Sequence, residues 1–387
     1  MTTLDNFEWP WTFRALNQLG EGLNRSGLLR VDLSEEALLA EACRRTGLTD
    51  WGGESFRAGL RVLLEAGRQE TDLSFLGRVA TRGDYLRLLM NRLRIQGALK
   101  RNPAILDLPL QQPLFIVGFP RTGSTLLHNL LSLDPQTRVP LMWELLRPAP
   151  PSNGGTDPRI RQATRLARVA HAMAPALRYT HPVRPAGPEE CFFLLENEFT
   201  CLEFEVRRHV PRYVTWFFQQ DLIPAYESYR RQLLLLHWQR PGEHWVLKSP
   251  FHLPGLEALL AVFPDACVVQ THRHPAEVVP SMCSVMGMVR KAHATHVDSL
   301  QLGADWLDTW GEAMSRASRI RDTADPKRFF DIEYRELVSD PLGMVERLYD
   351  HLGYAFTPQL ADRMRAWLRE NQHDKHGTHR TLWNNSG

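Results

Sequence analysis

The sequence has 387 residues, of which 43% are hydrophobic, and its 46 Lys and Arg residues balance 44 Asp and Glu residues to a formal net charge of +2. This composition is that of a globular chain long enough to bury a full core. The near-neutral charge gives no electrostatic footprint for nucleic acid, and no window approaches about 18 uninterrupted apolar residues. We therefore expect neither a nucleic-acid partner nor a transmembrane helix.

The cysteines are odd in number, five in all, and none forms a C-x-x-C pair. This pattern disfavours both a disulfide framework and a structural zinc site, and it is typical of a reducing compartment. The N-terminal stretch MTTLDNFEWPWTF has no basic segment followed by an apolar core, so we expect no secretory signal. The expected location is the cytoplasm.

Helical periodicity dominates the chain from residue 12 to residue 110. Apolar residues recur at helical spacing at Leu60, Leu63 and Leu64, and no stretch of this region alternates like a strand. We therefore predict an N-terminal helical subdomain or cap over residues 1–110 and a second domain over residues 111–387.

In the second domain, short apolar runs alternate with helical stretches. The predicted strands are 114–118, 244–247, 266–271 and 329–334, and the predicted helices are 124–133, 254–263, 275–290 and 341–353. Such alternation, with β-branched residues in the middle strands, favours a parallel sheet. The expected fold class is α/β: a P-loop-type open parallel sheet flanked by helices, with an N-terminal helical layer.

The stretch LFIVGFPRTGST is the first motif with chemical content. An apolar strand ends at Gly118, Gly123 follows at the spacing of a phosphate-binding loop, and Ser124 and Thr125 open the next helix. Backbone N–H groups at such a helix start point at an anion. Ser124 stands where a nucleoside-triphosphate enzyme has its lysine, and the positive charge lies at Arg121 instead. The motif therefore favours an anion held by backbone, hydroxyls and arginine, without a metal.

Polar residues also follow two other predicted strands. Lys248 and His252 come after the strand at 244–247, while Arg273 and Ser281 come after the strand at 266–271. Ligands of open α/β sheets bind beyond the carboxyl ends of the strands. We therefore expect these side chains to converge with the loop that carries Arg121.

Taken together, these motifs resemble those of the PAPS-dependent sulfotransferases, in particular the bacterial-type members of the P-loop sulfotransferase superfamily. PLFIVGFPRTGST resembles the family's 5′-phosphosulfate loop, and the stretch from Arg273 to Ser281 resembles its 3′-phosphate motif. DKHGTHRTLW, near the C-terminus, is similar to the basic loop that closes over the 3′-phosphate and adenine. The resemblance covers roughly residues 110–383.

The resemblance implies transfer of a sulfuryl group from PAPS (3′-phosphoadenosine-5′-phosphosulfate) to a hydroxyl or amine of a small acceptor, in line and without a metal. Aromatic residues in the chain favour an apolar acceptor. The donor-binding residues that it implies are Arg121, Thr122, Gly123, Ser124, Thr125, Arg273, Ser281, Lys375, Gly377 and Arg380.

The general base has two candidates. His252 lies in KSPFHLP, which resembles the K-T-H-L-P segment that carries the catalytic histidine in many cytosolic members, and a neutral imidazole accepts a proton near physiological pH. Glu189 and Glu190 precede an apolar run, and apolar surroundings raise the pKa of a carboxyl group. Lys248 is expected to act with Arg121 in stabilising charge on the transferring group.

Two other functions remain open on the sequence. A P-loop nucleotide kinase would share the loop after the first strand but would require Mg²⁺ and ATP. A protein that binds PAPS or its product PAP (3′-phosphoadenosine-5′-phosphate) without turnover would keep both phosphate motifs.

Overall fold

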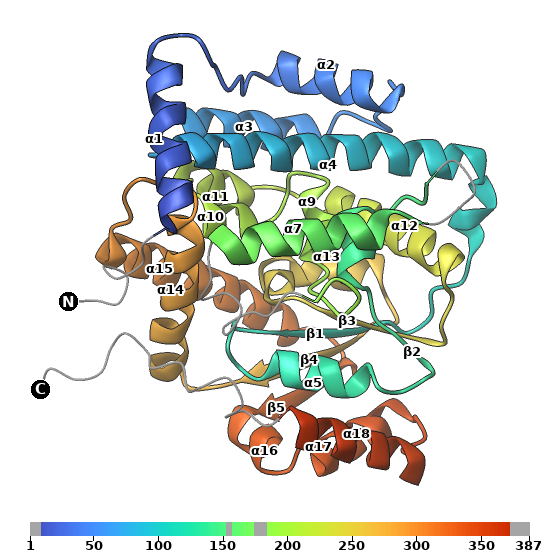
Figure 1. Cartoon of the computed structure of the whole chain (residues 1–387). Coiled ribbons are helices and arrows are strands. Elements are labelled where there is room, and N and C mark those ends of the chain that lie inside the picture. Colours follow the sequence, from blue (N-terminus) through green and yellow to red (C-terminus); the bar gives the residue numbers. More distant parts are fainter. Residues whose placement is uncertain (1–8, 152–156, 174–183, 372–387) are drawn as a thin grey trace, which may run out of the picture.

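The computed structural model describes residues 9–151, 157–173 and 184–371. A five-stranded parallel sheet lies at its centre, with helices on both faces (Figure 1). In the order of the sheet, its strands are β2 (Thr137–Arg138), β3 (His244–Lys248), β1 (Leu114–Gly118), β4 (Cys267–His272) and β5 (Phe329–Glu333). The predicted α/β class with an open parallel sheet is confirmed.

All four predicted strands form, with bounds shifted by at most one residue. The fifth strand, β2, was not predicted. It has two residues and exists through its pairing with β3, where Thr137 lies opposite His244. Two residues are too few to show the alternation of apolar and polar side chains that predicts a strand. Only the pairing with β3 in the tertiary structure defines β2.

The central strand β1 is buried on both faces, as an apolar run in a parallel sheet should be. Phe115 and Val117 belong to the larger hydrophobic cluster, whereas Leu114 and Ile116 belong to a second cluster on the opposite face. The alternation of side chains along the strand therefore divides one apolar run between two cores.

The second cluster, which contains Leu114 and Ile116, packs the sheet against four helices that lie below it in Figure 1. These are α5 (Ser124–Leu131), α16 (Tyr334–Ser339), α17 (Pro341–Leu352) and α18 (Pro358–Glu370). The larger cluster lies on the other face. It includes residues of α9 (Phe192–Glu196), α10 (Glu203–Arg207), α11 (Pro211–Phe217), α12 (Ile223–Gln239), η2 (Pro250–Gly255), α13 (Leu256–Val262), α14 (Pro275–Lys291) and α15 (Ser299–Arg321). The predicted helix at 254–263 thus begins as a 3₁₀ turn, and the 3₁₀ turn η3 (Pro326–Arg328) precedes β5.

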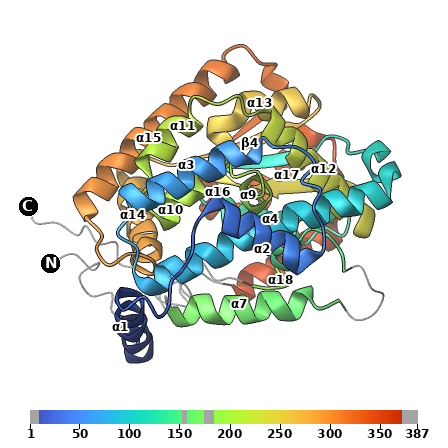
Figure 2. The same cartoon turned by 90° about the horizontal axis from the view of Figure 1, so that it is seen from above.

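The N-terminal region is helical, as predicted, and lies over the larger cluster (Figure 2). Its elements are α1 (Trp11–Arg25), α2 (Glu35–Thr46), α3 (Phe56–Gln69), α4 (Phe75–Arg101) and η1 (Pro103–Asp107). Leu38, Phe56 and Tyr85 belong to the same cluster as Phe115 of the sheet. The helices therefore share a core with the sheet, while the division of the chain near residue 110 stays a prediction.

Two further helices, α6 (Met142–Leu146) and α7 (Arg159–Met173), pack against each other, and α7 lies at the front of the molecule in Figure 1. Within the described ranges, no helix combines the length and the apolar character that crossing a membrane requires.

The strand order places a topological switch between β1 and β4. From β1 the chain runs outward to β2 and returns to β3, and it then crosses β1 to form β4 and β5 on the other side. In open α/β sheets ligands bind at such a point, beyond the carboxyl ends of the strands. The segments that follow β1, β3 and β4 therefore define the candidate site.

Candidate active site

The loop after β1 has a backbone suited to an anion. Gly118 has a φ of 131°, and a Cβ added there would lie 2.5 Å from the carbonyl oxygen of Thr271 in β4, so only glycine fits. Arg121 and Gly123 adopt φ values of 71° and 85°, and Gly123 is the N-cap of α5. Left-handed residues next to a helix start turn successive N–H groups toward one point, where an anion is stabilised. A left-handed arginine is uncommon, and residues with such backbone angles cluster at ligand-binding sites.

Thr122 does not place its side chain in the site, contrary to a donor-binding role for its hydroxyl. It is fully buried, and its Oγ1 donates to the carbonyl oxygen of Phe119 at 2.6 Å and lies 2.6 Å from Oγ1 of Thr271. The hydroxyl therefore ties the loop to β4, which leaves only the backbone N–H of Thr122 for a ligand.

Ser124 and Thr125 occupy the first turn of α5. Ser124 is half-buried and Thr125 is exposed, so both hydroxyls stand at the helix N-terminus where the partial positive charge of the helix is greatest. Lys375, Gly377 and Arg380 lie outside the described residues.

Arg121, Arg273 and Ser281 meet although more than 150 residues of sequence separate the first from the other two. The Nε of Arg121 donates to Oγ of Ser281 at 3.2 Å, and Nη1 of Arg273 donates to the carbonyl oxygen of Arg121 at 3.1 Å. Desolvation and the nearby Arg273 guanidinium lower the pKa of Arg121. Two guanidinium groups held side by side repel each other, and a bound anion between them would relieve that repulsion.

Arg273 is oriented by two residues that the sequence reasoning did not single out. Its Nε donates to Oε2 of Glu277 at 3.0 Å, and its guanidinium lies 4.2 Å from the ring centre of Tyr334. The Tyr334 ring also lines Gly123, where an added Cβ would lie 3.1 Å from it. Tyr334 directly follows β5, so the rule that sites lie beyond strand ends could have found it.

Lys248 and Glu190 form an ion pair at the end of β3. Lys248 is buried, and it lies opposite Ile116 of β1 in the parallel register. Its carbonyl oxygen accepts the backbone N–H of Cys191 at 3.0 Å, which brings the residues before α9 to the strand end. Glu190 is only half-buried, so its carboxylate stands between a buried ammonium group and the surface.

Glu189 has a structural environment that differs from that of its neighbour. Its side chain is buried, and Oε1 accepts the backbone N–H of Glu190 at 2.9 Å. Its own backbone N–H donates to the carbonyl oxygen of Pro140 at 3.1 Å. Glu189 therefore fixes the turn that presents Glu190.

His128 belongs to this region and was missed by the sequence reasoning. It is buried in α5, and its Nε2 has no hydrogen-bond partner among the residues that the structure describes. Burial, and secondarily the charge of Lys248, lower its pKa to about 3, so it is neutral at physiological pH. Because His128 follows Ser124 by four positions, helical spacing could have placed the two on one face.

His252 does not fit the predicted role of general base. It is fully buried beside the rings of Phe115 and Tyr229, with ring centres 5.2 and 5.5 Å away. Its Nδ1 lies 2.9 Å from the hydroxyl of Tyr226, and its Nε2 lies 3.2 Å from Sγ of Cys191. Burial lowers its pKa to about 3. Both ring nitrogens lie against buried partners, an environment that does not favour the role of general base.

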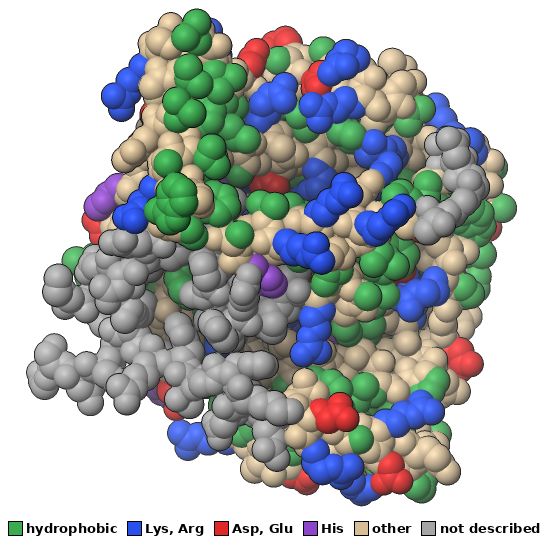
Figure 3. All heavy atoms as spheres, in the orientation of Figure 1, with side chains coloured by type: hydrophobic (Ala, Val, Ile, Leu, Met, Phe, Trp, Pro, Cys, Tyr) green, Lys and Arg blue, Asp and Glu red, His purple; other side chains and the backbone are tan. Residues whose placement is uncertain are grey.

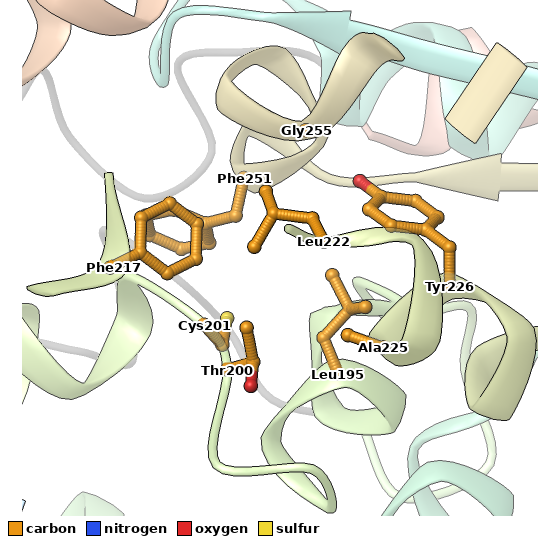
Figure 4. A pocket seen from close by; sticks show the side chains of 9 residues that line it. All are labelled: Leu195, Thr200, Cys201, Phe217, Leu222, Ala225, Tyr226, Phe251 and Gly255. Atoms are coloured by element: carbon orange, nitrogen blue, oxygen red, sulfur yellow. The ribbon is translucent and has the colours of Figure 1, made fainter. Parts of the chain in front are cut away.

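A small apolar pocket lies beside η2, whose Phe251 and Gly255 help to line it (Figure 4). Phe251 and Phe217 line one side and Tyr226 lines another, as Figure 4 shows. Its free volume of about 10 Å³ is barely enough for one water molecule. This pocket therefore fits no acceptor molecule.

Comparison with known proteins places these features in a family. The model of the sulfotransferase family matches residues 113–358. Omega-hydroxy-beta-dihydromenaquinone-9 sulfotransferase Stf3 of Mycobacterium bovis is 28% identical over 272 residues, which are 67% of this chain and 67% of that protein.

Two solved structures resemble the whole fold. Sulfotransferase STF1 of Mycobacterium tuberculosis H37Rv superposes with a TM-score of 0.80 at 35% identity, covering 87% of this chain and 94% of that one. Sulfotransferase STF9 of Mycobacterium avium has a TM-score of 0.80 at 29% identity, covering 88% and 89%.

Proposed function

The chain belongs to the sulfotransferase family, and on that premise we propose that its sulfuryl donor is PAPS and its acceptor is a hydroxyl group on an apolar molecule. The observation that carries the proposal is the contact of Arg121 with both Arg273 and Ser281. It joins the anion-binding loop after β1 to a second cationic position after β4. PAPS needs two such positions, because it carries a 5′-phosphosulfate and a separate 3′-phosphate.

In this proposal the loop from Gly118 to Thr125 holds the 5′-phosphosulfate through its backbone N–H groups and the hydroxyls of Ser124 and Thr125. Arg121 offsets the charge that develops on the leaving phosphate. Arg273 and Ser281 hold the 3′-phosphate, and Tyr334 fixes the Arg273 guanidinium by stacking. A 3′-phosphate role for Lys375, Gly377 and Arg380 stays a prediction.

We assign the general base to Glu190. The acceptor oxygen attacks sulfur in line, the bond from sulfur to the bridging oxygen breaks, and PAP leaves with that oxygen. The acceptor proton passes to the Glu190 carboxylate, while the Lys248 ammonium group stabilises the sulfuryl oxygens. Glu190 is supported by its pairing with Lys248 at the end of β3, and its side chain is 14% exposed.

The acceptor that we propose is a lipid-like alcohol. The relative Stf3 is named for a hydroxylated menaquinone, a molecule that joins a reactive hydroxyl to an apolar body. In this chain, half-buried Trp143 and Phe193 pack against a cluster made of Met142, Leu146 and Ala163, and Phe193 follows Glu190 closely in the sequence. Aromatic side chains in this part of the chain suit such a molecule.

Binding and transfer assays test the proposal separately. In calorimetry without Mg²⁺, PAP should bind at least about tenfold more tightly than adenosine 5′-phosphate, because only PAP fills the second cationic position. Tight binding of ATP with Mg²⁺, and no effect of the 3′-phosphate, would contradict the donor. Sulfate transfer from labelled PAPS to long-chain alcohols, phenols and amines then tests the acceptor, and tight PAP binding without any transfer would indicate a binding protein.

A further inference from the structure

Exposed apolar side chains are concentrated on two segments of the described chain. Eight of the fifteen large apolar residues that are exposed there lie on α1 with the loop after it, or on α7. They are Trp11, Leu16, Leu19, Leu28 and Leu29 on the first segment, and Ile160, Leu166 and Val169 on the second. Figure 3 shows apolar side chains gathered along α1. Single exposed apolar residues are ordinary, but a group of this size marks an interaction surface.

The outward direction of these residues on α1 is fixed by contacts on its other side. Gly20 packs so closely on Phe75 of α4 that an added Cβ would clash with the ring. Asn17 accepts the backbone N–H of Leu76 at 3.0 Å, and Glu21 pairs with Arg78 at 2.7 Å. Because α4 holds this side of α1, Leu16 and Leu19 remain exposed at 54% and 62%.

On α7 the exposed apolar residues alternate with cations. Ala163 and Ala167 are buried, Ala163 against Met142 and Leu146 of α6. Arg161, Arg165 and Arg168 are exposed beside the three apolar residues. The sequence of α7 contains no Asp or Glu, and Asp157 just before it is bonded to Arg159. Figure 3 shows the basic side chains as a row over this helix.

The two segments lie on the same side of the molecule. In Figure 1 both α1 and α7 lie in front, and the view from above in Figure 2 shows both at the front edge. Between residues 9 and 31 the only acidic residue is Glu21, which Arg78 neutralises, while Arg25 and Arg30 add positive charge. We call the exposed residues of α1, the loop 26–30 and α7 the α1–α7 face.

We propose that the α1–α7 face docks on the surface of an anionic lipid bilayer. Apolar side chains of interfacial helices enter the boundary between headgroups and acyl chains, and arginines beside them attract anionic headgroups. A second copy of the chain fits less well, because a two-fold interface would set this basic face against itself. This inference depends only on the residues of the α1–α7 face and not on the proposed acceptor. Docking of this face would bring the protein to a bilayer in which an apolar acceptor dissolves.

Vesicle binding of the full chain tests this proposal. We expect binding to phosphatidylcholine vesicles that contain phosphatidylglycerol, weakened by added salt, and little binding to phosphatidylcholine alone. The triple variant R161Q/R165Q/R168Q should bind the anionic vesicles about 100-fold more weakly, at about fivefold for each arginine. The double variant L16Q/L19Q should lose at least about tenfold, because its apolar side chains no longer enter the boundary.

Matched control variants remove the same groups from other surfaces. R363Q/R365Q/R369Q takes three exposed arginines from α18, and L300Q/L307Q takes two exposed leucines from α15; both should bind vesicles like the unchanged chain. PAP affinity should be unchanged in every variant, which separates docking from the donor site.

Three results would overturn the proposal: equal binding to both vesicle types, unchanged binding of the α7 triple variant, or equal losses in the controls. A dimer in sedimentation that L16Q/L19Q abolishes would instead assign the face to contact between copies of the chain.

Discussion

Arg121 is the residue on which the candidate site depends most. Its backbone is in the left-handed region, and its Nε donates a hydrogen bond to Ser281. Its carbonyl oxygen accepts a hydrogen bond from Arg273. Its backbone and its side chain thus engage different partners. Removing the side chain takes away the charge and leaves the loop backbone in place.

The variant R121A should therefore bind PAP about 10- to 150-fold more weakly, since a hydrogen bond to a charged group contributes about 1.5–3 kcal/mol. Titration calorimetry measures the change. R365A on α18, whose arginine pairs with Asp362 on the surface, serves as the control and should bind PAP normally. Unchanged PAP affinity in R121A would remove the arginine from the donor site.

The two carboxylates before α9 should differ sharply in their effect on turnover. E190Q should lower kcat about 10²- to 10⁴-fold, because the amide cannot accept the acceptor's proton, and it can still hydrogen-bond to Lys248. E189Q should stay within a few-fold, because its amide oxygen can still accept the backbone N–H of Glu190.

A change at the buried histidine tests whether Glu190 or His252 is the general base. H252F should lose about 1–3 kcal/mol of unfolding free energy, since it leaves the hydroxyl of Tyr226 without its partner, and it should keep its kcat within a few-fold. A stably folded H252F with a kcat as low as that of E190Q would restore His252 as the base.

At the scale of elements, the turn from β1 to α5 is held by sterics that only glycine satisfies. G118A should lower the unfolding free energy by about 1–3 kcal/mol and weaken PAP binding, because the φ of 131° and the contact with Thr271 both oppose a side chain. G83A in α4 is the matched control: nothing lies within 4 Å of its added Cβ, so it should stabilise the helix by about 0.5–1 kcal/mol. Urea unfolding of both variants checks the contrast, which equal destabilisation would contradict.

At the scale of the whole molecule, three histidines whose pKa burial lowers, His128, His252 and His293, make stability depend on pH. Burial lowers the pKa of His128 and of His252 to about 3, against about 6.5 in an unfolded chain. Below pH about 6.5 the unfolded chain binds more protons, so the unfolding free energy should fall with decreasing pH by up to about 1.4 kcal/mol per pH unit for each histidine.

Urea unfolding between pH about 7 and about 5 measures this slope. The variant H252F should lose the part of the slope that belongs to one histidine. An unchanged slope in H252F would show that His252 does not contribute to the pH dependence.

The sequence by itself determined four of the five strands, the parallel α/β class and the two anion motifs, because these depend on local period, glycine positions and short spacings. It also placed Arg121, Arg273 and Ser281 beyond strand ends, where parallel topology brings them together. It could not decide the side-chain environments of His252 and Thr122. KSPFHLP contains polar residues, yet in the structure His252 lies on η2 and is buried in the aromatic core. The hydroxyl of Thr122 likewise points toward Thr271.

Only the tertiary structure decided which carboxylate pairs with Lys248, since adjacent Glu189 and Glu190 are equivalent in the sequence until Pro140 and Lys248 hold them in different environments. The same holds for the α1–α7 face. Two helices more than 130 residues apart form one surface because α4 and α6 hold their opposite sides, and no local pattern records that contact.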